Sequence, residues 1–224
     1  MKLTKKQQTW KNLDADKVYT LSDAIDVLRE YASKKFDETL EIAIRLGIDV
    51  TKADQNIRGM LSLPNGTGKS VRVAVFTANA QDEAKQAGAD VVGGEELIDS
   101  VAAGNINFDR VIATPDMMPK MSKIARILGP KGLMPNPKLG TVTNNVADAV
   151  KTAKAGQIEY RAEKKGIIHA GIGKMSFTTD KLVENAVALI DQLKKVKPAS
   201  SKGQYILGIS VSTTQGPGLK VDAK

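Results

Sequence analysis

The hydrophobic pattern of this 224-residue chain changes twice, and these changes constrain the fold more than any other feature. From residue 67 to residue 159, short apolar strands alternate with amphipathic helices. The run at 71–76 is apolar at nearly every position, which is typical of a strand in a sheet covered on both faces. Strict alternation of strand and helix predicts a small parallel α/β sheet here. Strands are expected at 71–76, 91–92 and 108–113, and helices at 81–87, 95–103, 119–128 and 145–155.

The two flanking segments follow a different pattern, in which apolar and polar residues alternate along strands. Such alternation indicates strands with one face in a core and one in solvent. Strands are expected at 39–46, 57–63 and 204–214, with Leu207, Ile209, Val211 and Thr213 on the core side of the last. Residues 158–162 and 166–170 are expected to form a hairpin. Helices are expected after the capping-box pattern Thr20–Asp23 and at 180–195.

Neither flanking segment has enough strands and helices to bury a core alone. Together they predict a discontinuous antiparallel α+β domain of residues 1–66 and 160–224. An inserted α/β domain of residues 67–159, built on a parallel sheet, interrupts it. The chain would cross between the two near residues 64–68 and 156–160, which we expect to be a hinge.

Charge distinguishes the two expected domains and points to a polyanionic partner. The chain has a formal net charge of +8. Residues 67–159 contain 11 Lys and Arg against 10 Asp and Glu, whereas the flanking segments contain 22 against 15. The expected polyanion-binding surface is therefore on the composite domain. The chain has no Cys and a single His, His169, which excludes thiolate chemistry and His-based metal clusters. We predict no metal site, no cofactor and no membrane span, and we expect a soluble cytoplasmic protein.

Two segments of the flanks carry residue types suited to RNA. In Lys34–Thr39, Phe36 follows two lysines, so a ring that can stack on a base stands beside cations that can meet phosphates. A core phenylalanine with solvated lysines is the alternative. Ser210–Gly216 combines hydroxyl groups with a glycine that lets another backbone approach, as contacts to 2′-hydroxyls and phosphates require. A plain edge strand ending in a turn remains the other interpretation.

Two further patterns suggest ligands less strongly. Gly66–Ser70 resembles the end of a phosphate-binding loop, but it lacks the first glycine of that motif and precedes a strand instead of a helix. A flexible crossover fits this segment better. Asp109, Asp116 and the pair Glu95–Glu96 lie near ends of α/β elements, where such folds bind ligands. A small enzyme with a phosphate-bearing substrate near Thr114–Asp116 is therefore the alternative function, although solvated helix caps explain these acids as well.

Residues 126–142 contain three Pro, three Gly and three Lys or Arg, so they are expected to form a loop. Their apolar residues suggest packing on the same domain. The loop closely resembles the signature of the large-subunit ribosomal protein L-one family, whose members lie at the base of the mobile stalk. The signature residues are Arg126, Gly129, Pro130, Lys131, Gly132, Pro135, Pro137 and Lys138.

Other motifs resemble the same family, in the same order along the chain. They are Lys35–Thr39, Leu46–Asp49, Asp54–Gly59, Gly93–Glu96, Ala113–Asp116 and Ser212–Thr214. The resemblance implies a discontinuous α+β domain with an inserted Rossmann-like domain. It also implies binding to large-subunit ribosomal RNA, help in releasing deacylated tRNA from the exit site, and repression of the protein's own operon through its messenger RNA.

The resemblance further implies a non-catalytic protein that is monomeric when free of the ribosome. At the position where bacterial relatives usually carry Met, this chain has Gln215, which would replace an apolar contact by a hydrogen bond. The RNA-contacting residues that the resemblance implies are Lys35, Phe36, Thr39, Arg45, His169, Lys174, Thr213, Thr214, Gln215 and Gly216. The signature loop is expected to face tRNA or the other domain and not to be the main RNA anchor.

Overall fold

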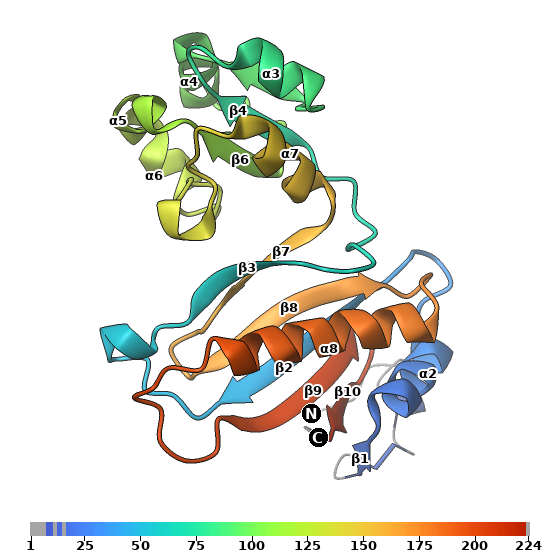
Figure 1. Cartoon of the computed structure of the whole chain (residues 1–224). Coiled ribbons are helices and arrows are strands. Elements are labelled where there is room, and N and C mark those ends of the chain that lie inside the picture. Colours follow the sequence, from blue (N-terminus) through green and yellow to red (C-terminus); the bar gives the residue numbers. More distant parts are fainter. Residues whose placement is uncertain (1–7, 11–12, 15–16, 223–224) are drawn as a thin grey trace. The chain divides into compact units, whose positions relative to one another are not determined.

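The computed structural model describes residues 8–10, 13–14 and 17–222, apart from the side chain of residue 53. The chain forms two compact units (Figure 1). We call Met1–Gly68 with Ile158–Lys224 the outer unit, and Lys69–Gln157 the inserted unit. Antiparallel pairing dominates the first and parallel pairing the second. The predicted mixture of parallel and antiparallel α/β structure is therefore confirmed.

The outer unit contains a five-stranded sheet in the order β1-β10-β9-β2-β8. Its strands are β1 (Val18–Tyr19), β2 (Thr39–Leu46), β8 (Ile167–Lys174), β9 (Ile206–Thr213) and β10 (Gly218–Val221). β1 and β10 are parallel, and the other pairs are antiparallel. β2 is hydrogen-bonded on both sides, to β8 and to β9, so it holds together segments from opposite ends of the chain.

Two helices, α2 (Leu21–Tyr31) and α8 (Thr179–Lys195), contribute to the core on one side of this sheet (Figure 1). α2 begins where the Thr20 hydroxyl accepts a hydrogen bond from Asp23 N at 3.2 Å, as the capping pattern predicts. Leu28 of α2 and Leu189 of α8 are fully buried with Ile42 of β2 in one cluster. The other face of β2 carries Glu41 and Arg45, both exposed, and we call this side of the sheet the open face.

The predicted hairpin at 158–170 is wrong as a regular strand pair. β7 (Gln157–Arg161) pairs with β3 (Arg58–Ser62) in a separate two-stranded sheet, and a single bridge between Ala162 and Ile168 connects it to β8. In the turn between β7 and β8, the carbonyl oxygen of Gly166 points towards β2, where it accepts a hydrogen bond from Leu46 N at 2.9 Å. A positive φ of 70° at Gly166 makes this turn possible.

Leu207 does not lie in the core, contrary to the alternating pattern of β9. Arg45 pairs with Gly208 but Leu46 pairs with Ile206, so Leu207 is an extra residue in a β-bulge. The bulge turns Leu207 outward, where 47% of it is exposed, and places Ile206 inside. Ile209, Val211 and Thr213 are buried as predicted.

The inserted unit contains three parallel strands in the order β5-β4-β6. Successive residues of the central strand enter different core clusters: Ala74 and Phe76 belong to one, Val73 and Val75 to the other. Both faces of the sheet are therefore covered, as the apolar run predicts. The elements are β4 (Val73–Phe76), β5 (Val91–Gly93), β6 (Arg110–Ala113), α3 (Gln81–Gln86), α4 (Glu95–Ala102) and α7 (Val146–Lys154).

The helix predicted at 119–128 is a series of short turns instead of one helix. Residues 115–128 form η2 (Pro115–Met117), α5 (Met118–Met121), η3 (Ser122–Ile124) and α6 (Ala125–Leu128). Pro119 lies in the first turn of α5, where proline is tolerated, and Pro119 O accepts from both the backbone N–H and the hydroxyl of Ser122, at the point where α5 gives way to a 3₁₀ turn. The buried residues Met117, Met121, Ile124 and Leu128 still recur at helical spacing, which explains why the pattern suggested a continuous helix.

Candidate nucleic-acid interface

Thr39, the first residue of β2, lies between two segments that carry predicted RNA-contacting residues. Thr39 pairs with Lys174 at the end of β8. On its other side, Thr39 N donates to Thr214 Oγ1 at 3.0 Å, and Thr214 N donates to Thr39 O at 3.2 Å. Residues far apart in the sequence thus meet at one end of the sheet. We call this group the strand-end cluster: Lys35, Phe36, Thr39, Lys174, Thr213, Thr214, Gln215 and Gly216.

Phe36 lies on the surface of this cluster and not in the core. It is 43% exposed, and its neighbours Lys34 and Lys35 are exposed too. The loop that carries them is held by hydrogen bonds, including one from Lys35 N to Ser33 Oγ at 3.2 Å. An exposed aromatic ring beside two cations is the arrangement expected for stacking on a base next to phosphates. The alternative of a core phenylalanine is therefore wrong.

Lys174 serves partly as a structural donor. Its Nζ donates to the carbonyl oxygen of Asp37 at 3.0 Å. The Asp37 carboxylate in turn accepts from Ser176 N at 3.1 Å and from Ser176 Oγ at 2.7 Å. These contacts fix the segment that follows Phe36 against the end of β8. An ammonium group has three donors, so Lys174 retains capacity for a phosphate.

Thr213 and Gly216 shape the turn after β9, and Thr214 and Gln215 present it to solvent. The Thr213 side chain is only 4% exposed, and its Oγ1 is buried without a hydrogen-bond partner among the residues described. Gly216 N donates to Thr213 O at 3.1 Å. A Cβ atom at Gly216 would overlap Thr213 Oγ1, so a larger residue there would force the buried Thr213 side chain to move. Thr214 and Gln215 are exposed, whereas Thr213 supports the turn from beneath.

Arg45 and His169 lie farther along the open face. Arg45 is six residues from Thr39 on β2, about 20 Å at the usual rise per residue. Ala43 of β2 pairs with His169 of β8 on one side and with Ser210 of β9 on the other. Both Arg45 and His169 are exposed. The ten predicted residues thus occupy two places, the strand-end cluster and the far part of the open face.

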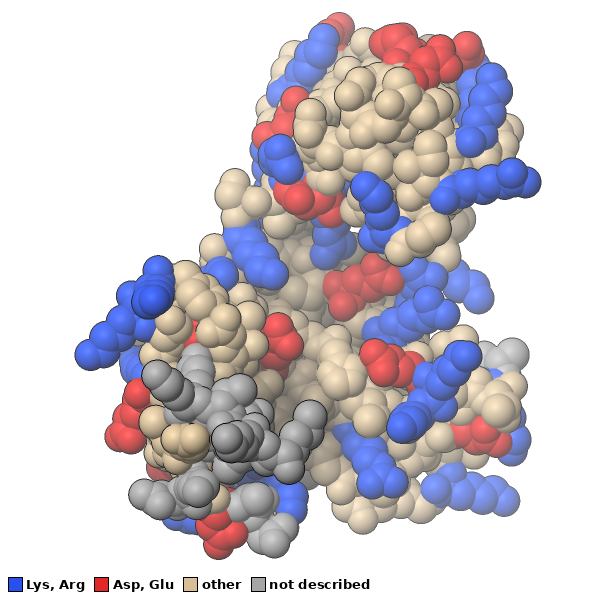
Figure 2. Space-filling view, turned by 180° about the vertical axis from the view of Figure 1, so that it is seen from behind, with Lys and Arg blue, Asp and Glu red and all other residues tan. Residues whose placement is uncertain are grey.

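A groove of about 930 Å³ adjoins His169, and it brings in charged residues that the sequence patterns did not suggest. His169 Nε2 lies 3.9 Å from Glu163 Oε2 at its edge. Basic and acidic side chains both line the groove, so its charge is mixed. The charged residues along it are Glu159, Arg161, Glu163, Lys164 and Lys165. On the face shown in Figure 2, Lys and Arg are likewise interspersed with Asp and Glu.

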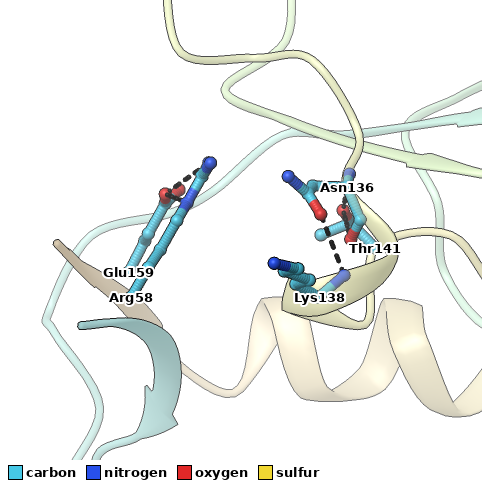
Figure 3. Close-up of polar contacts among 5 residues, drawn as sticks. All are labelled: Arg58, Asn136, Lys138, Thr141 and Glu159. Carbon is cyan, nitrogen blue, oxygen red and sulfur yellow. Dashed lines mark hydrogen bonds and ion pairs between the residues drawn. The ribbon is translucent and has the colours of Figure 1, made fainter. Parts of the chain in front are cut away.

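The signature loop is a well-packed loop of the inserted unit. Asn136 N donates to Thr141 Oγ1 at 2.8 Å, and Lys138 N donates to Asn136 Oδ1 at 2.9 Å, which closes the segment into a compact turn (Figure 3). Leu128 and Leu139 are buried. Val142 then pairs with Ala113 of β6. The predicted packing on its own domain is therefore confirmed, and it leaves Lys131 and Lys138 exposed.

At the alternative ligand site, near the ends of the parallel strands, Thr114, Glu95 and Glu96 form hydrogen bonds or ion pairs within the protein. Thr114 is 8% exposed and its N–H donates to Phe76 O at 3.0 Å. Glu95 forms an ion pair with Lys120, and the hydrogen bond from Lys120 lowers the pKa of Glu95 below its ordinary value. Glu96 accepts from Gly94 N at 3.2 Å. Among the described residues, no group of three or more His, Asp or Glu side chains is arranged to hold a metal ion.

The Gly66–Ser70 segment leads into β4 and does not open a helix, which a phosphate-binding loop would require. Its start is tied to α8, because Asn185 Nδ2 donates to Gly66 O at 3.0 Å. Gly66 and Gly68 both have positive φ values, 66° and 70°. These torsions bend the chain at the border of the outer unit.

Comparison with protein families identifies the family of the chain. The chain matches the ribosomal protein L1p/L10e family over residues 28–217, which includes all ten predicted RNA-contacting residues and the signature loop. In the described part of the chain, no helix is long and apolar enough to cross a membrane. The match over residues 28–217 shows that the chain belongs to the ribosomal protein L1p/L10e family: it is a large-subunit ribosomal protein that binds ribosomal RNA and is located in the cytoplasm as part of the ribosome.

Proposed function

We propose that the outer unit binds a folded element of large-subunit ribosomal RNA through the strand-end cluster and the open face. The exposed ring of Phe36, between Lys35 and the fixed end of β2, is the observation that carries this assignment. Phe36 would stack on an unpaired base. Thr214, Gln215 and the backbone near Gly216 would contact sugar and phosphate groups. Arg45 and His169 would meet the RNA backbone farther along the sheet.

The site assignment is tested by filter binding or calorimetry with a transcript of the stalk region of the ribosomal RNA. Phe36→Ala removes a stacking platform and should weaken binding by about 1–3 kcal/mol, or about 5- to 150-fold. Thr214→Ala should have an effect of similar size, because it removes the hydroxyl that joins the turn to Thr39 at the strand end and that would face the RNA sugar and phosphate groups. Val187→Ala is the matched control, because Val187 is similarly exposed but lies on α8, on the side of the sheet opposite the open face. Wild-type affinity in both test variants would sink the assignment.

Lysines at the edge of this surface are expected to act only through charge. Lys35→Ala should weaken binding to all RNA sequences about equally and reduce the slope of log affinity against log salt by about one unit. A variant that lost sequence preference instead would show that Lys35 reads a base. Binding measured at three or more salt concentrations separates the two results.

We infer that the two units act as separate domains joined near residues 64–68 and 156–160. In this proposal the composite domain, 1–66 with 160–224, docks rigidly on the stalk RNA, and the Rossmann-like domain, 67–159, helps release deacylated tRNA from the exit site. The exposed residues Lys131 and Lys138 of the signature loop are suited to a tRNA backbone. Lys131→Ala with Lys138→Ala should leave binding to stalk RNA unchanged and slow tRNA release. Lost binding to the isolated stalk RNA would refute this division.

The same interface is proposed to bind the messenger RNA of the protein's own operon and to repress its translation. Such regulation requires a messenger structure that presents the same contacts as the ribosomal site. Phe36→Ala should therefore lower the affinity for both RNAs by similar factors, and it should relieve repression of a reporter that carries the operon leader. Repression that survives while ribosomal RNA binding is lost would mean that the two RNAs use different surfaces. We further propose that the protein is non-catalytic and monomeric when free of the ribosome.

A further inference from the structure

A buried carboxylate lies beneath the strand-end cluster, and neither the sequence patterns nor the proposed RNA contacts account for it. Glu38, the residue before β2, is only 1% exposed. Its Oε1 accepts a hydrogen bond from Ser33 N at 2.8 Å, and its Oε2 accepts from Gln215 N at 3.2 Å. Its main-chain oxygen accepts from Met175 N at 2.9 Å. One residue thus contacts the loop after α2, the end of β8 and the turn after β9.

The two segments that Glu38 joins are those that carry the exposed candidate contacts. Ser33 begins the loop that presents Lys35 and Phe36, and its hydroxyl also holds Lys35 N. Gln215 lies between Thr214 and Gly216 in the turn after β9. A buried carboxylate is costly unless hydrogen bonds compensate it, and bonds to a charged acceptor are about twice as strong as neutral ones. The carboxylate can therefore fix the spacing between the Phe36 loop and the Thr214 turn.

We propose that Glu38 is a positioning residue for RNA binding: it holds Phe36 and the Thr214–Gly216 turn in the spacing that the RNA requires without touching RNA itself. The inference rests on the proposed placement of the RNA interface. It differs from that proposal in predicting an effect for a side chain that RNA cannot reach.

The sign of the effect separates positioning from simple electrostatics. Glu38→Gln removes a negative charge close to the RNA surface, which by charge alone should tighten binding. The amide has only one acceptor oxygen, so one of the two backbone N–H groups loses its partner. Positioning therefore predicts weaker binding with an unchanged salt slope. Glu38→Asp keeps the charge but shortens the side chain, so its carboxylate cannot span both donors, and it too should bind more weakly.

The experiment measures the affinity of the full-length variants for the stalk-region transcript, with thermal unfolding to confirm that each is folded. We expect about a 10-fold loss for Glu38→Asp and for Glu38→Gln. Glu30→Gln, the same chemical change at an exposed site on α2, is the charge-matched control and should stay within about twofold of wild type. Glu38→Asp keeps the test decisive if Glu38→Gln does not fold.

A double-mutant cycle with Phe36→Ala measures the coupling between Glu38 and Phe36 in RNA binding. General destabilisation of the protein would not produce such coupling. If Glu38 acts by placing Phe36, the loss caused by Glu38→Asp should shrink to about threefold or less once the ring is absent. Equal losses in both backgrounds, wild-type affinity of Glu38→Asp, or tighter binding by Glu38→Gln would each overturn the inference. If Phe36→Ala and Thr214→Ala themselves bind normally, the interface is misplaced, and that result is separate from a failure of Glu38 alone.

Discussion

Asn185 of α8 offers the sharpest test of how the outer unit is held together. It is completely buried, yet it is polar, and all its hydrogen-bonding groups face other segments. Nδ2 donates to Ile172 O of β8 at 2.7 Å and to Gly66 O at 3.0 Å, and Oδ1 accepts from Asn65 N at 3.1 Å. One amide thus ties the helix to the sheet and to the start of the crossover.

Asn185→Ala should destabilise the outer unit by about 3 kcal/mol. The change removes three hydrogen bonds, each worth about 1 kcal/mol net, and leaves buried backbone groups without partners. For a unit of this size the loss corresponds to a fall in melting temperature of about 10 °C. Asn185→Asp should be at least as damaging at neutral pH, because a carboxylate oxygen would then face two carbonyl oxygens.

Thermal or denaturant unfolding followed by circular dichroism measures this loss, with Asn65→Ala as the control. The Asn65 side chain donates to Lys181 O and Glu184 Oε2 in exposed positions, so its removal should cost less than about 1 kcal/mol. A shift below about 3 °C for Asn185→Ala would show that water or a rearranged loop replaces the amide. Equal losses in the Asn65 and Asn185 variants would likewise contradict the reasoning.

Two further predictions concern the turn after β9 and Tyr205, the residue before that strand. Gly216→Ala should lower RNA affinity and cost about 1–3 kcal/mol of stability, because the new methyl group would displace the buried Thr213 side chain; binding and melting curves check both effects, and a variant unchanged in either would refute the packing argument. Burial, with a smaller contribution from Tyr160, raises the pKa of Tyr205 to about 12, above its ordinary value near 10. The neutral phenol therefore contributes its full stability below pH 10 and loses it as the pH rises towards 12, so wild type should lose about 1–3 kcal/mol more than Tyr205→Phe over that interval. Urea unfolding of both proteins from pH 8 to pH 12 tests this, and parallel curves would contradict it.

Local patterns were sufficient to predict most of the fold. Alternation along 39–46 correctly placed Leu40, Ile42, Ile44 and Leu46 in the core. The apolar run at 71–76 correctly indicated a parallel strand covered on both faces. These predictions succeed because side-chain burial follows the periodicity of the backbone.

The errors arose where tertiary pairing overrides that periodicity. The bulge at Leu207 depends on its register with β2, which no pattern within β9 reveals. The hairpin failed because β7 pairs with β3, a strand about 100 residues earlier in the sequence. The helix expected at 119–128 is interrupted by the 3₁₀ turn at Ser122–Ile124, and the apolar spacing is the same on both sides of that turn, so it gives no sign of the break.

The candidate site was predictable in its residue types but not in its division of roles. Phe36 beside two lysines could be recognised as a base-stacking candidate, and the structure shows that it is exposed. Thr213 and Thr214 look alike in sequence, yet one is buried and the other exposed, because β9 ends at Thr213 and Thr214 lies in the turn that follows. Glu38 was missed because an acid in a basic segment suggests a solvated charge, and only the tertiary structure shows its two backbone partners.

The architecture also determines what a minimal RNA-binding fragment must contain. Phe36 and Thr214 belong to segments that meet only because β2 pairs with both β8 and β9. A peptide that contains only the first segment lacks the Thr39–Thr214 hydrogen bonds and the Gln215 donor to Glu38. The Phe36 loop would then become ordered only when RNA binds, and its loss of conformational entropy would weaken binding by about 1–2 kcal/mol per fixed residue. We therefore expect RNA affinity to require the complete outer unit and to be lost when either segment is removed.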